Sequence, residues 1–297
     1  MSSCTCSRTW TPVRPAPAAS CTPVHPRSES TRAERAASRA SNSLRCGFGE
    51  RHMRRYLLLA LAAAGALVLG SCQQTLDGSG TPAKERRIVG DFNRISLSIP
   101  GSVEIVQGDS TGVVIEGDDN IVPAIETAVR RGTLHIGKVG ELGAVALRPE
   151  TPLRIRVDVR GLSVVELVGS CDVVVPTLDA DRVSVNVSGS GEVFIRELTA
   201  LEVSVSLAGS GNATLGGRAI RQEVTVSGTG SYDGRPLETK QAVVTVSGSG
   251  NALVNASGAL EAIVSGSGSV GYLGDPVVEE RVTGSGEVGP LRRLSDS

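Results

Sequence analysis

The chain has 297 residues, of which 40% are hydrophobic, so it can bury a core in one or two domains. Its formal net charge of −1 hides a division: residues 1–71 contain 10 basic and 3 acidic residues, whereas residues 72–297 contain 20 basic and 28 acidic residues. The larger part is acidic and lacks the basic face that nucleic acids require, so nucleic acid is excluded as a partner.

Residues 1–52 are rich in Ser, Arg, Pro and Ala and show no hydrophobic periodicity. Such a segment cannot bury a core, and we predict that it is disordered or is an extension translated from a misplaced start codon. Cys4, Cys6 and His25 fit no zinc-ligand spacing, so no metal site is predicted here.

A secretory signal peptide is predicted over residues 53–71. Met53 precedes two arginines, and an apolar run follows from Tyr56 to Val68. A positive region before an apolar region is typical of the start of an exported protein, so Met53 is the predicted translation start. The apolar run is shorter than the ~20 residues that a membrane-spanning helix needs, which disfavours a transmembrane anchor. The two arginines leave twin-arginine export as an alternative to the favoured Sec route.

A lipid attachment site is predicted at Cys72. The residues Leu69, Gly70 and Ser71 before it resemble a bacterial lipobox, in which small residues give the signal peptidase access and the thiol accepts the lipid. Acyl chains would anchor the mature protein to a membrane, and the outer membrane is favoured because the next residue is not Asp. The alternative is a simple signal peptide in which this cysteine is incidental. Only Cys72 and Cys171 remain after cleavage, so no internal disulfide is expected.

The segment that follows is polar, and residues 72–87 are predicted to form a flexible tether. Residues 88–160 then alternate apolar and polar side chains as strands do, and form either irregular early coils or an end cap of the repeats that follow. Within them, apolar residues at intervals of four predict a short helix over residues 121–129. Asp118-Asp119-Asn120 would begin this helix and Gly132 would end it.

A short phrase, most often Ser-Gly-Ser-Gly, then returns at steps of 20, 20, 19, 20, 18 and 18 residues. A fixed period of this length predicts a solenoid, here over residues 161–290, followed by a tail over residues 291–297. Its first glycines are Gly169, Gly189, Gly209, Gly228, Gly248, Gly266 and Gly284.

Each repeat alternates apolar and polar residues through the glycine phrase without a change of phase, as in Val183, Val185 and Val187 before it and Val193 and Ile195 after it. Period two indicates strands, and no helical segment separates the repeats, so the predicted fold is all-β, a parallel β-helix of about 18–20 residues per coil. Glycine would serve at each corner through a positive φ or through the absence of a side chain where backbones stack. The structural corner glycines are Gly189, Gly191, Gly209, Gly211, Gly228, Gly230, Gly248, Gly250, Gly266, Gly268, Gly284 and Gly286.

The sequence also resembles a known family, the head GIN domain of auto-transporter adhesins, which is frequent in bacterial lipoproteins. The resemblance lies in residues 90–95 (Gly-Asp-Phe-Asn-Arg-Ile), 100–105 (Pro-Gly-Ser-Val-Glu-Ile) and 116–121 (Glu-Gly-Asp-Asp-Asn-Ile), and in the serial Ser-Gly-Ser-Gly repeats. It implies a right-handed β-helix over residues 88–287 and no known reaction. Cys171 departs from the family pattern in a glycine slot, where we expect a buried, reduced and unreactive thiol.

No catalytic site, cofactor or metal is predicted. A corner serine would need a base as nucleophile, and the only histidine after Cys72 is His135, far upstream of most repeats. Gly266, Gly268 and Gly271 match the spacing of a dinucleotide-binding loop, but no strand-to-helix unit follows them. We therefore predict that the protein is not an enzyme.

The best candidate surface is the residue that follows each second glycine slot. In register, these side chains would form a polar column, which is expected to be a solvated outer face; a cation between its first two members is a minor alternative. The column comprises Asp172, Glu192, Asn212, Ser231, Asn251, Ser269 and Glu287.

These observations predict an exported, lipid-anchored protein that serves binding or adhesion at the cell envelope, with an unknown envelope or surface ligand. One alternative is a structural scaffold that assembles with copies of itself into homo-oligomers. The other is a polysaccharide-active enzyme, which the short returns and the scarcity of aromatic residues disfavour.

Overall fold

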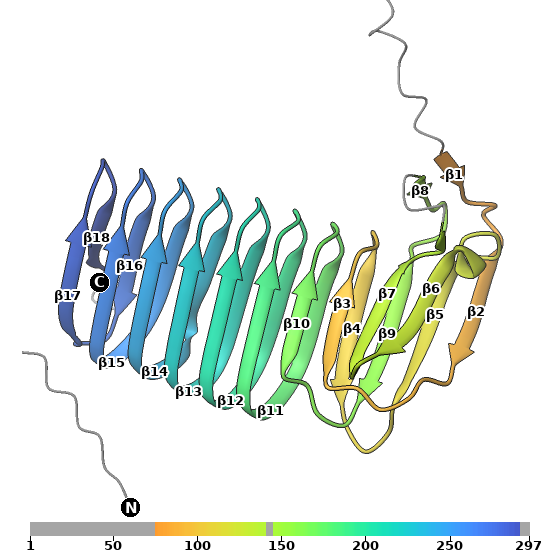
Figure 1. Cartoon of the computed structure of the whole chain (residues 1–297), viewed down its shortest axis with the longest axis horizontal. Coiled ribbons are helices and arrows are strands. Elements are labelled where there is room, and N and C mark those ends of the chain that lie inside the picture. Colours follow the sequence, from red (N-terminus) through yellow and green to blue (C-terminus); the bar gives the residue numbers. More distant parts are fainter. Residues whose placement is uncertain (1–74, 141–144, 292–297) are drawn as a thin grey trace, which may run out of the picture. The chain divides into compact units, whose positions relative to one another are not determined.

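Long strands that stack in parallel dominate the structure, a computed structural model that describes residues 75–140 and 145–291 (Figure 1). Each strand pairs with the next one along the chain, so that Val185 lies beside Val205 and Val205 beside Val224. One repeat of the sequence is therefore one coil, and the predicted β-solenoid is confirmed. The long strands are β11 (Asp172–Val187), β12 (Glu192–Leu207), β13 (Asn212–Val226), β14 (Ser231–Val246) and β15 (Asn251–Val264).

Each coil closes around a narrow apolar core. In β11, Val173 and Val175 on one side and Val183, Val185 and Val187 on the other are all buried. The chain between the two sides keeps its pairing with the next coil, for example at Leu178 with Leu198. Because the return is itself paired, the backbone groups of a coil find partners in the neighbouring coils rather than in a loop.

One coil contains a buried tyrosine where its neighbours have alanine. Tyr232 is 0% exposed and lies between Ala213 and Ala252 in the adjacent coils. A β-carbon at Gly234 would lie 2.6 Å from its hydroxyl oxygen, so the missing side chain there makes room for the ring. The two alanines and this glycine offset the volume of the tyrosine, as a close-packed core requires.

The Tyr232 hydroxyl begins a buried chain of hydrogen bonds. It donates to Oε1 of Gln222 at 3.0 Å, and Nε2 of Gln222 donates to Oγ1 of Thr239 at 2.9 Å. Thr239 then donates to the carbonyl oxygen of Asn255 at 2.7 Å. Burial raises the pKa of the Tyr232 phenol, so the ring stays neutral and acts as a donor. Every side chain in this chain of bonds is satisfied, which makes a polar group in the core tolerable.

The N-terminal end of the stack departs from sequence order. The strands β3 (Arg94–Leu97) and β4 (Ser102–Gln107) form a coil that lies between the repeats and a segment that comes later in the chain. On one side of this coil, β3 lies between β10 (Val164–Leu167) of the repeats and β7 (Thr133–Lys138). Likewise β4 lies between β11 and β9 (Arg154–Val159). Both options left open for residues 88–160 are therefore present, an early coil and a cap.

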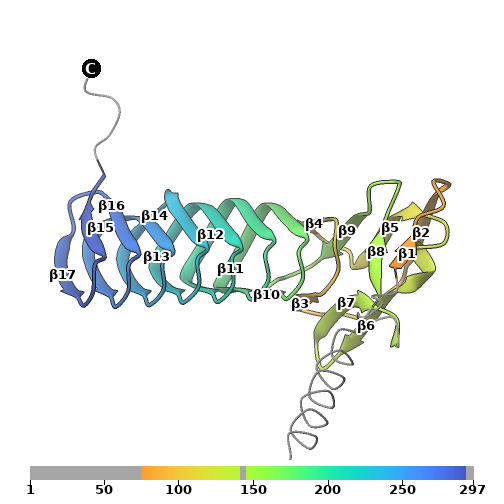
Figure 2. The same cartoon turned by 90° about the horizontal axis from the view of Figure 1, so that it is seen from above.

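Antiparallel strands make up the cap, and Figure 2 shows them at one end of the stacked coils. Strand β2 (Pro82–Arg87) pairs with β5 (Gly112–Asp118), and β5 pairs with β9. Strand β6 (Ile125–Arg130) pairs with β7, while the short β1 (Thr75–Asp77) pairs in parallel with β8 (Ala146–Arg148). The change from parallel to antiparallel pairing ends the regular stack at this side.

Two sequence predictions in this region are wrong. The helix predicted over residues 121–129 is a 3-10 turn, η1 (Val122–Ala124), followed by strand β6. A spacing of four residues also fits a strand, because four is a multiple of two, and antiparallel pairing with β7 decides between the two periods. Residues 75–77 and 82–87 of the predicted flexible tether form β1 and β2.

Asp118 holds together two turns of the cap instead of capping a helix. Its buried carboxylate accepts hydrogen bonds from the backbone N–H groups of Gly80, Glu150 and Thr151, at 2.9–3.2 Å. Burial opposes ionisation of Asp118, but these hydrogen bonds outweigh it and keep the pKa of the carboxyl below its usual range. The neighbouring Asp119 is exposed and accepts a hydrogen bond from Oγ of Ser79 at 2.5 Å.

We expect Asp118→Asn to lower the unfolding temperature by on the order of 5 °C at pH 7. Because the folded pKa of Asp118 is depressed, its stabilisation is present above the unfolded value of about 3.9 and is lost as the pH falls through the folded value. The variant should therefore also lose less stability than wild type between pH 5 and pH 3, in urea titrations followed by circular dichroism. Asp119→Asn is the matched control and should behave like wild type; equal behaviour of the two variants would contradict the assigned role.

The stack ends with a coil made of β16 (Ser269–Leu273) and β17 (Val277–Val282), on which the short strand β18 (Glu287–Pro290) lies. Strand β17 pairs with β15 and β18 pairs with β16, and within the described residues neither has a partner on its other side. Glu280 pairs with the fully buried Ala262, so it takes a position on the inward row of the coil. A charged residue therefore stands at the open end where the other coils have apolar side chains.

Candidate functional site

The corner glycines form two columns along the stack, and their close approach explains the residue type. A β-carbon at Gly209 would lie 2.2 Å from the carbonyl oxygen of Gly189, and one at Gly230 would lie 2.0 Å from that of Gly211. Among the twelve predicted corner glycines only Gly284 has a positive φ, of 122°. Of the two reasons that the sequence offers for glycine, the stacking of backbones therefore applies at nearly every corner.

The serines between these glycines are exposed and their hydroxyls make few contacts. Oγ1 of Thr229 donates to Oγ of Ser210 at 3.1 Å, so the hydroxyls of two successive corners bind each other there. His135 lies on β7 in the cap, beside Ser96 of β3 and Ala128 of β6. These positions give the corner serines no catalytic partner within the part of the chain that the structure describes.

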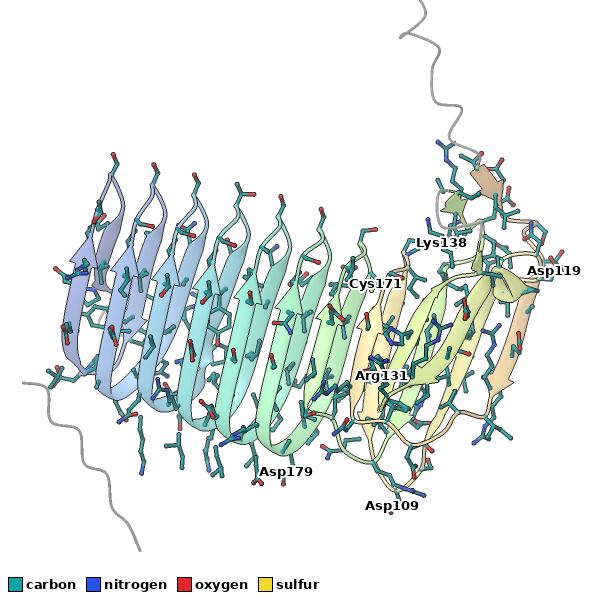
Figure 3. All side chains as sticks on the ribbon, viewed as in Figure 1. Asp109, Asp119, Arg131, Lys138, Cys171 and Asp179 are labelled. Atoms are coloured by element: carbon teal, nitrogen blue, oxygen red, sulfur yellow. The ribbon has the colours of Figure 1, made fainter. Side chains whose placement is uncertain are left out.

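Cys171 occupies the second glycine slot of the first regular corner (Figure 3). Its side chain is 0% exposed and unpaired, and burial raises the pKa of the thiol to about 12. A buried thiol that stays protonated is a poor nucleophile, so the geometry agrees with the expectation of an unreactive cysteine.

The polar column forms as the repeats predict. Glu192 lies beside Asn212, and Asn251 lies between Ser231 and Ser269. The asparagine side chains also bind the next coil: Oδ1 of Asn212 accepts the N–H of Ser231 at 3.0 Å, and Oδ1 of Asn251 accepts the N–H of Ser269 at 3.2 Å. Part of the column is therefore a ladder that joins successive coils.

The structure extends this column into the cap, which the sequence period does not reveal. Asp172 lies beside Ser102 of β4, and Ser102 lies beside Arg154 of β9. Arg154 in turn lies beside Glu116 of β5, and Glu116 beside Lys84 of β2. The described residues hold no group of three or more His, Cys, Asp or Glu side chains that could bind a metal ion.

The outer face of the cap strands is hollowed where this extension runs. One hollow of ≈ 530 Å³ lies over β2, β5, β9, β4 and the start of β11, and a second of ≈ 560 Å³ lies towards Pro82 and Pro152. Both are lined by Lys84, Glu116 and Arg154, so they form one continuous depression, here called the cap trough.

Ion pairs along the cap trough leave one guanidinium unpaired. Nζ of Lys84 lies 2.7 Å from Oε1 of Glu116, and Arg156 contacts Asp158 at 3.1 Å and Glu104 at 3.9 Å. Arg154 is exposed between these pairs and makes no hydrogen bond or ion pair within 4 Å among the described residues. The pKa of the neighbouring Glu116 carboxyl is lowered mainly by the hydrogen bond from Lys84 and also by the charge of Arg154. The trough therefore presents a positive group that is available to a ligand.

The predicted lipobox and its flanks lie outside the described residues. These are Leu69, Gly70, Ser71 and Cys72, with the signal peptide over residues 53–71, the extension over residues 1–52 and most of the tail over residues 291–297. Within residues 75–140 and 145–291, no helix is long and apolar enough to cross a membrane.

A parallel β-solenoid with an antiparallel cap and an exposed polar face is an architecture of binding and structural proteins as well as of enzymes. Residues 91–276 match the family model described as "Putative auto-transporter adhesin, head GIN domain", so the chain belongs to this family and the resemblance in the sequence is confirmed. No curated protein matches this chain in sequence.

Solved structures share the fold. An adhesin-like protein of Bacteroides fragilis superposes with a TM-score of 0.68 at 25% identity, over 73% of this chain and 100% of that chain. A protein of Parabacteroides distasonis described as lipid-binding has a TM-score of 0.64 at 24% identity, over 74% of this chain and 100% of that chain. An adhesin-like protein of Parabacteroides merdae has a TM-score of 0.58 at 20% identity, over 74% of this chain and 100% of that chain.

Proposed function

We propose that this chain is an exported lipoprotein, attached through Cys72 to a membrane of the cell envelope, whose solenoid serves binding or adhesion without catalysis. The observation that carries the proposal is the order of Met53 with its arginines, the apolar run, and Leu69-Gly70-Ser71-Cys72. The descriptions of the matching family model and of the similar structure from Bacteroides fragilis both name an adhesin, which supports export and a non-enzymatic role. The favoured location is the outer membrane, on its periplasmic or cell-surface face.

The structure adds a consequence for the anchored protein. Strand β1 begins at Thr75, three residues after Cys72, and an extended chain covers at most about 3.6 Å per residue. However the chain runs between these residues, the anchor lies within about 11 Å of β1. The cap end of the solenoid would therefore face the membrane, and the repeats would extend from it.

Cells grown with a palmitate analogue test the anchor. Wild-type protein should incorporate the label, and Cys72→Ser should lose it because serine lacks the thiol that accepts the lipid. Cys46→Ser is the matched control, since the predicted start at Met53 removes that cysteine, and should be labelled like wild type. Label that persists in Cys72→Ser would refute the proposal, and protease treatment of intact cells would separate a surface location from a periplasmic one.

A structural scaffold is the second candidate, because hydrogen bonds from the asparagines of the polar column join successive coils. Size-exclusion chromatography with light scattering of the purified protein separates the two functions. A scaffold forms homo-oligomers on its own, whereas a binding protein forms a larger complex only when its ligand is added.

A further inference from the structure

We propose that the cap trough binds an acidic oligosaccharide, with Arg154 pairing with a carboxylate of the sugar. This inference rests on the proposed binding function and names the class of its ligand. Two contiguous hollows of ≈ 530 and ≈ 560 Å³ lie within the range of ligand sites in proteins, about 300–1,000 Å³.

The charges in the trough match a hydroxyl-rich acid. The trough contains Lys84, Arg154 and Arg156 against Glu104 and Glu116, so it combines one excess positive charge with carboxylates that can accept hydrogen bonds from hydroxyl groups. Arg154 makes no ion pair within 4 Å among the described residues, and its planar guanidinium fits a carboxylate in a bidentate pair. The ligand should therefore carry one acid group over the site and several hydroxyls beside it.

The hydroxyls of the trough itself and its apolar floor fit the same ligand. Ser102 and Thr151 line its two parts. Val174 is 36% exposed at the hollow of ≈ 530 Å³ and lies beside Phe194 in the next coil. Sugars present apolar C–H faces between their hydroxyls, and such faces pack against apolar and aromatic side chains.

A planar membrane surface fits the trough less well. Residues 161–297 carry 9 basic and 16 acidic residues, so the repeats are repelled by anionic lipids. The cationic groups lie in a concave face, and two of them, Lys84 and Arg156, are paired with carboxylates, whereas headgroup contact favours a protruding cluster of unpaired Lys and Arg. A chain-like ligand can enter the cap trough and contact its charged groups, whereas a flat bilayer surface would lie across the rim of the trough.

The experiment is affinity electrophoresis of the full chain in a non-ionic detergent, in gels that contain polygalacturonate, dextran or no polysaccharide. Polygalacturonate should retard the wild-type protein and dextran should not. Residues 72–297 are acidic overall, so within them a polyanion is attracted only through a local site, whereas retardation caused by the basic residues 1–71 would persist when Arg154 is replaced. Absence of retardation in polygalacturonate would overturn the proposal.

Substitutions then locate the site. Arg154→Gln should weaken retardation about tenfold or more, since it removes a charge-assisted pair, and Arg154→Lys should restore part of it. Arg182→Gln is the matched control, because it removes the same charge from an arginine that is 83% exposed in the repeats, and should leave retardation unchanged. Arg154→Gln that binds like wild type, with an unchanged thermal transition, contradicts the proposal.

Vesicles of phosphatidylglycerol provide the competing outcome. Binding to these vesicles that depends on Arg154, without retardation in polygalacturonate, would assign the trough to lipid headgroups and refute the sugar. Lipid labelling at Cys72 is measured separately in cells, so a failure of the anchor and a failure of the sugar site are distinguishable.

Discussion

Gly248→Ala is expected to destabilise the solenoid by about 4 kcal/mol or more, which is at the extreme of single substitutions. A β-carbon there would lie 2.2 Å from the carbonyl oxygen of Gly228, where real contacts stay above 3.0 Å. That same oxygen accepts hydrogen bonds from the N–H groups of Ser249 and Gly250, so it cannot move away without breaking them. The lower entropy of the unfolded alanine chain returns only about 0.4–1 kcal/mol.

Ser249→Ala is the matched control one residue away. Its side chain is exposed at the same corner, so the change should stay within about 0.5 kcal/mol. Urea unfolding of both variants measures the difference in stability, and it is followed by circular dichroism at about 218 nm, where β-strands give their signal. Similar midpoints for Gly248→Ala and Ser249→Ala would show that the coils can separate at the corner and that stacking does not require glycine there.

Tyr232→Ala is expected to cost about 3–5 kcal/mol, the range for removing a large aromatic side chain from a core. The neighbours Ala213 and Ala252 are too small to fill the space, and Gln222 loses the donor to its buried Oε1. Tyr232→Phe keeps the ring and isolates the hydrogen bond, so it should cost about 1–3 kcal/mol.

The two tyrosine variants are best compared by urea unfolding at pH 7. The order wild type, Tyr232→Phe, Tyr232→Ala is the expected ranking of midpoints, with unchanged slopes. A phenylalanine variant as stable as wild type would show that the chain through Gln222 and Thr239 contributes nothing, and an alanine variant within about 1 kcal/mol would show that the coil collapses around the missing ring.

The repeats could be predicted from the sequence because each coil carries its own information. Strand period, corner and coil length all recur at 18–20 residues, and parallel stacking places identical positions beside one another, as with Val185 and Val205. The strand pairing of the N-terminal cap could not be predicted, because β3 lies between β7 and β10, and an insertion out of chain order leaves no period in the sequence. The same long-range pairing turns residues 125–130 into a strand.

Part of the candidate surface could be predicted from the repeat and part could not. The polar column from Asp172 to Glu287 follows from the repeat, whereas Lys84, Glu116 and Arg154 come from three strands that only antiparallel pairing brings together. Asp118 shows a related limit: an acidic residue before an apolar segment is typical of a helix start, but its carboxylate binds the backbone of turns 30–40 residues away. A motif can be recognised in sequence while its partners remain hidden.

A stack of near-identical coils has no natural last member, because the exposed edge of each coil is a template for another strand. An uncovered strand edge can pair with strands of other molecules, and repeated pairing of this kind forms fibrils. Glu280 interrupts this growth, since a newly added coil would have to bury its carboxylate against apolar side chains. The carboxylate of Glu280 thus opposes the addition of a further coil to β17.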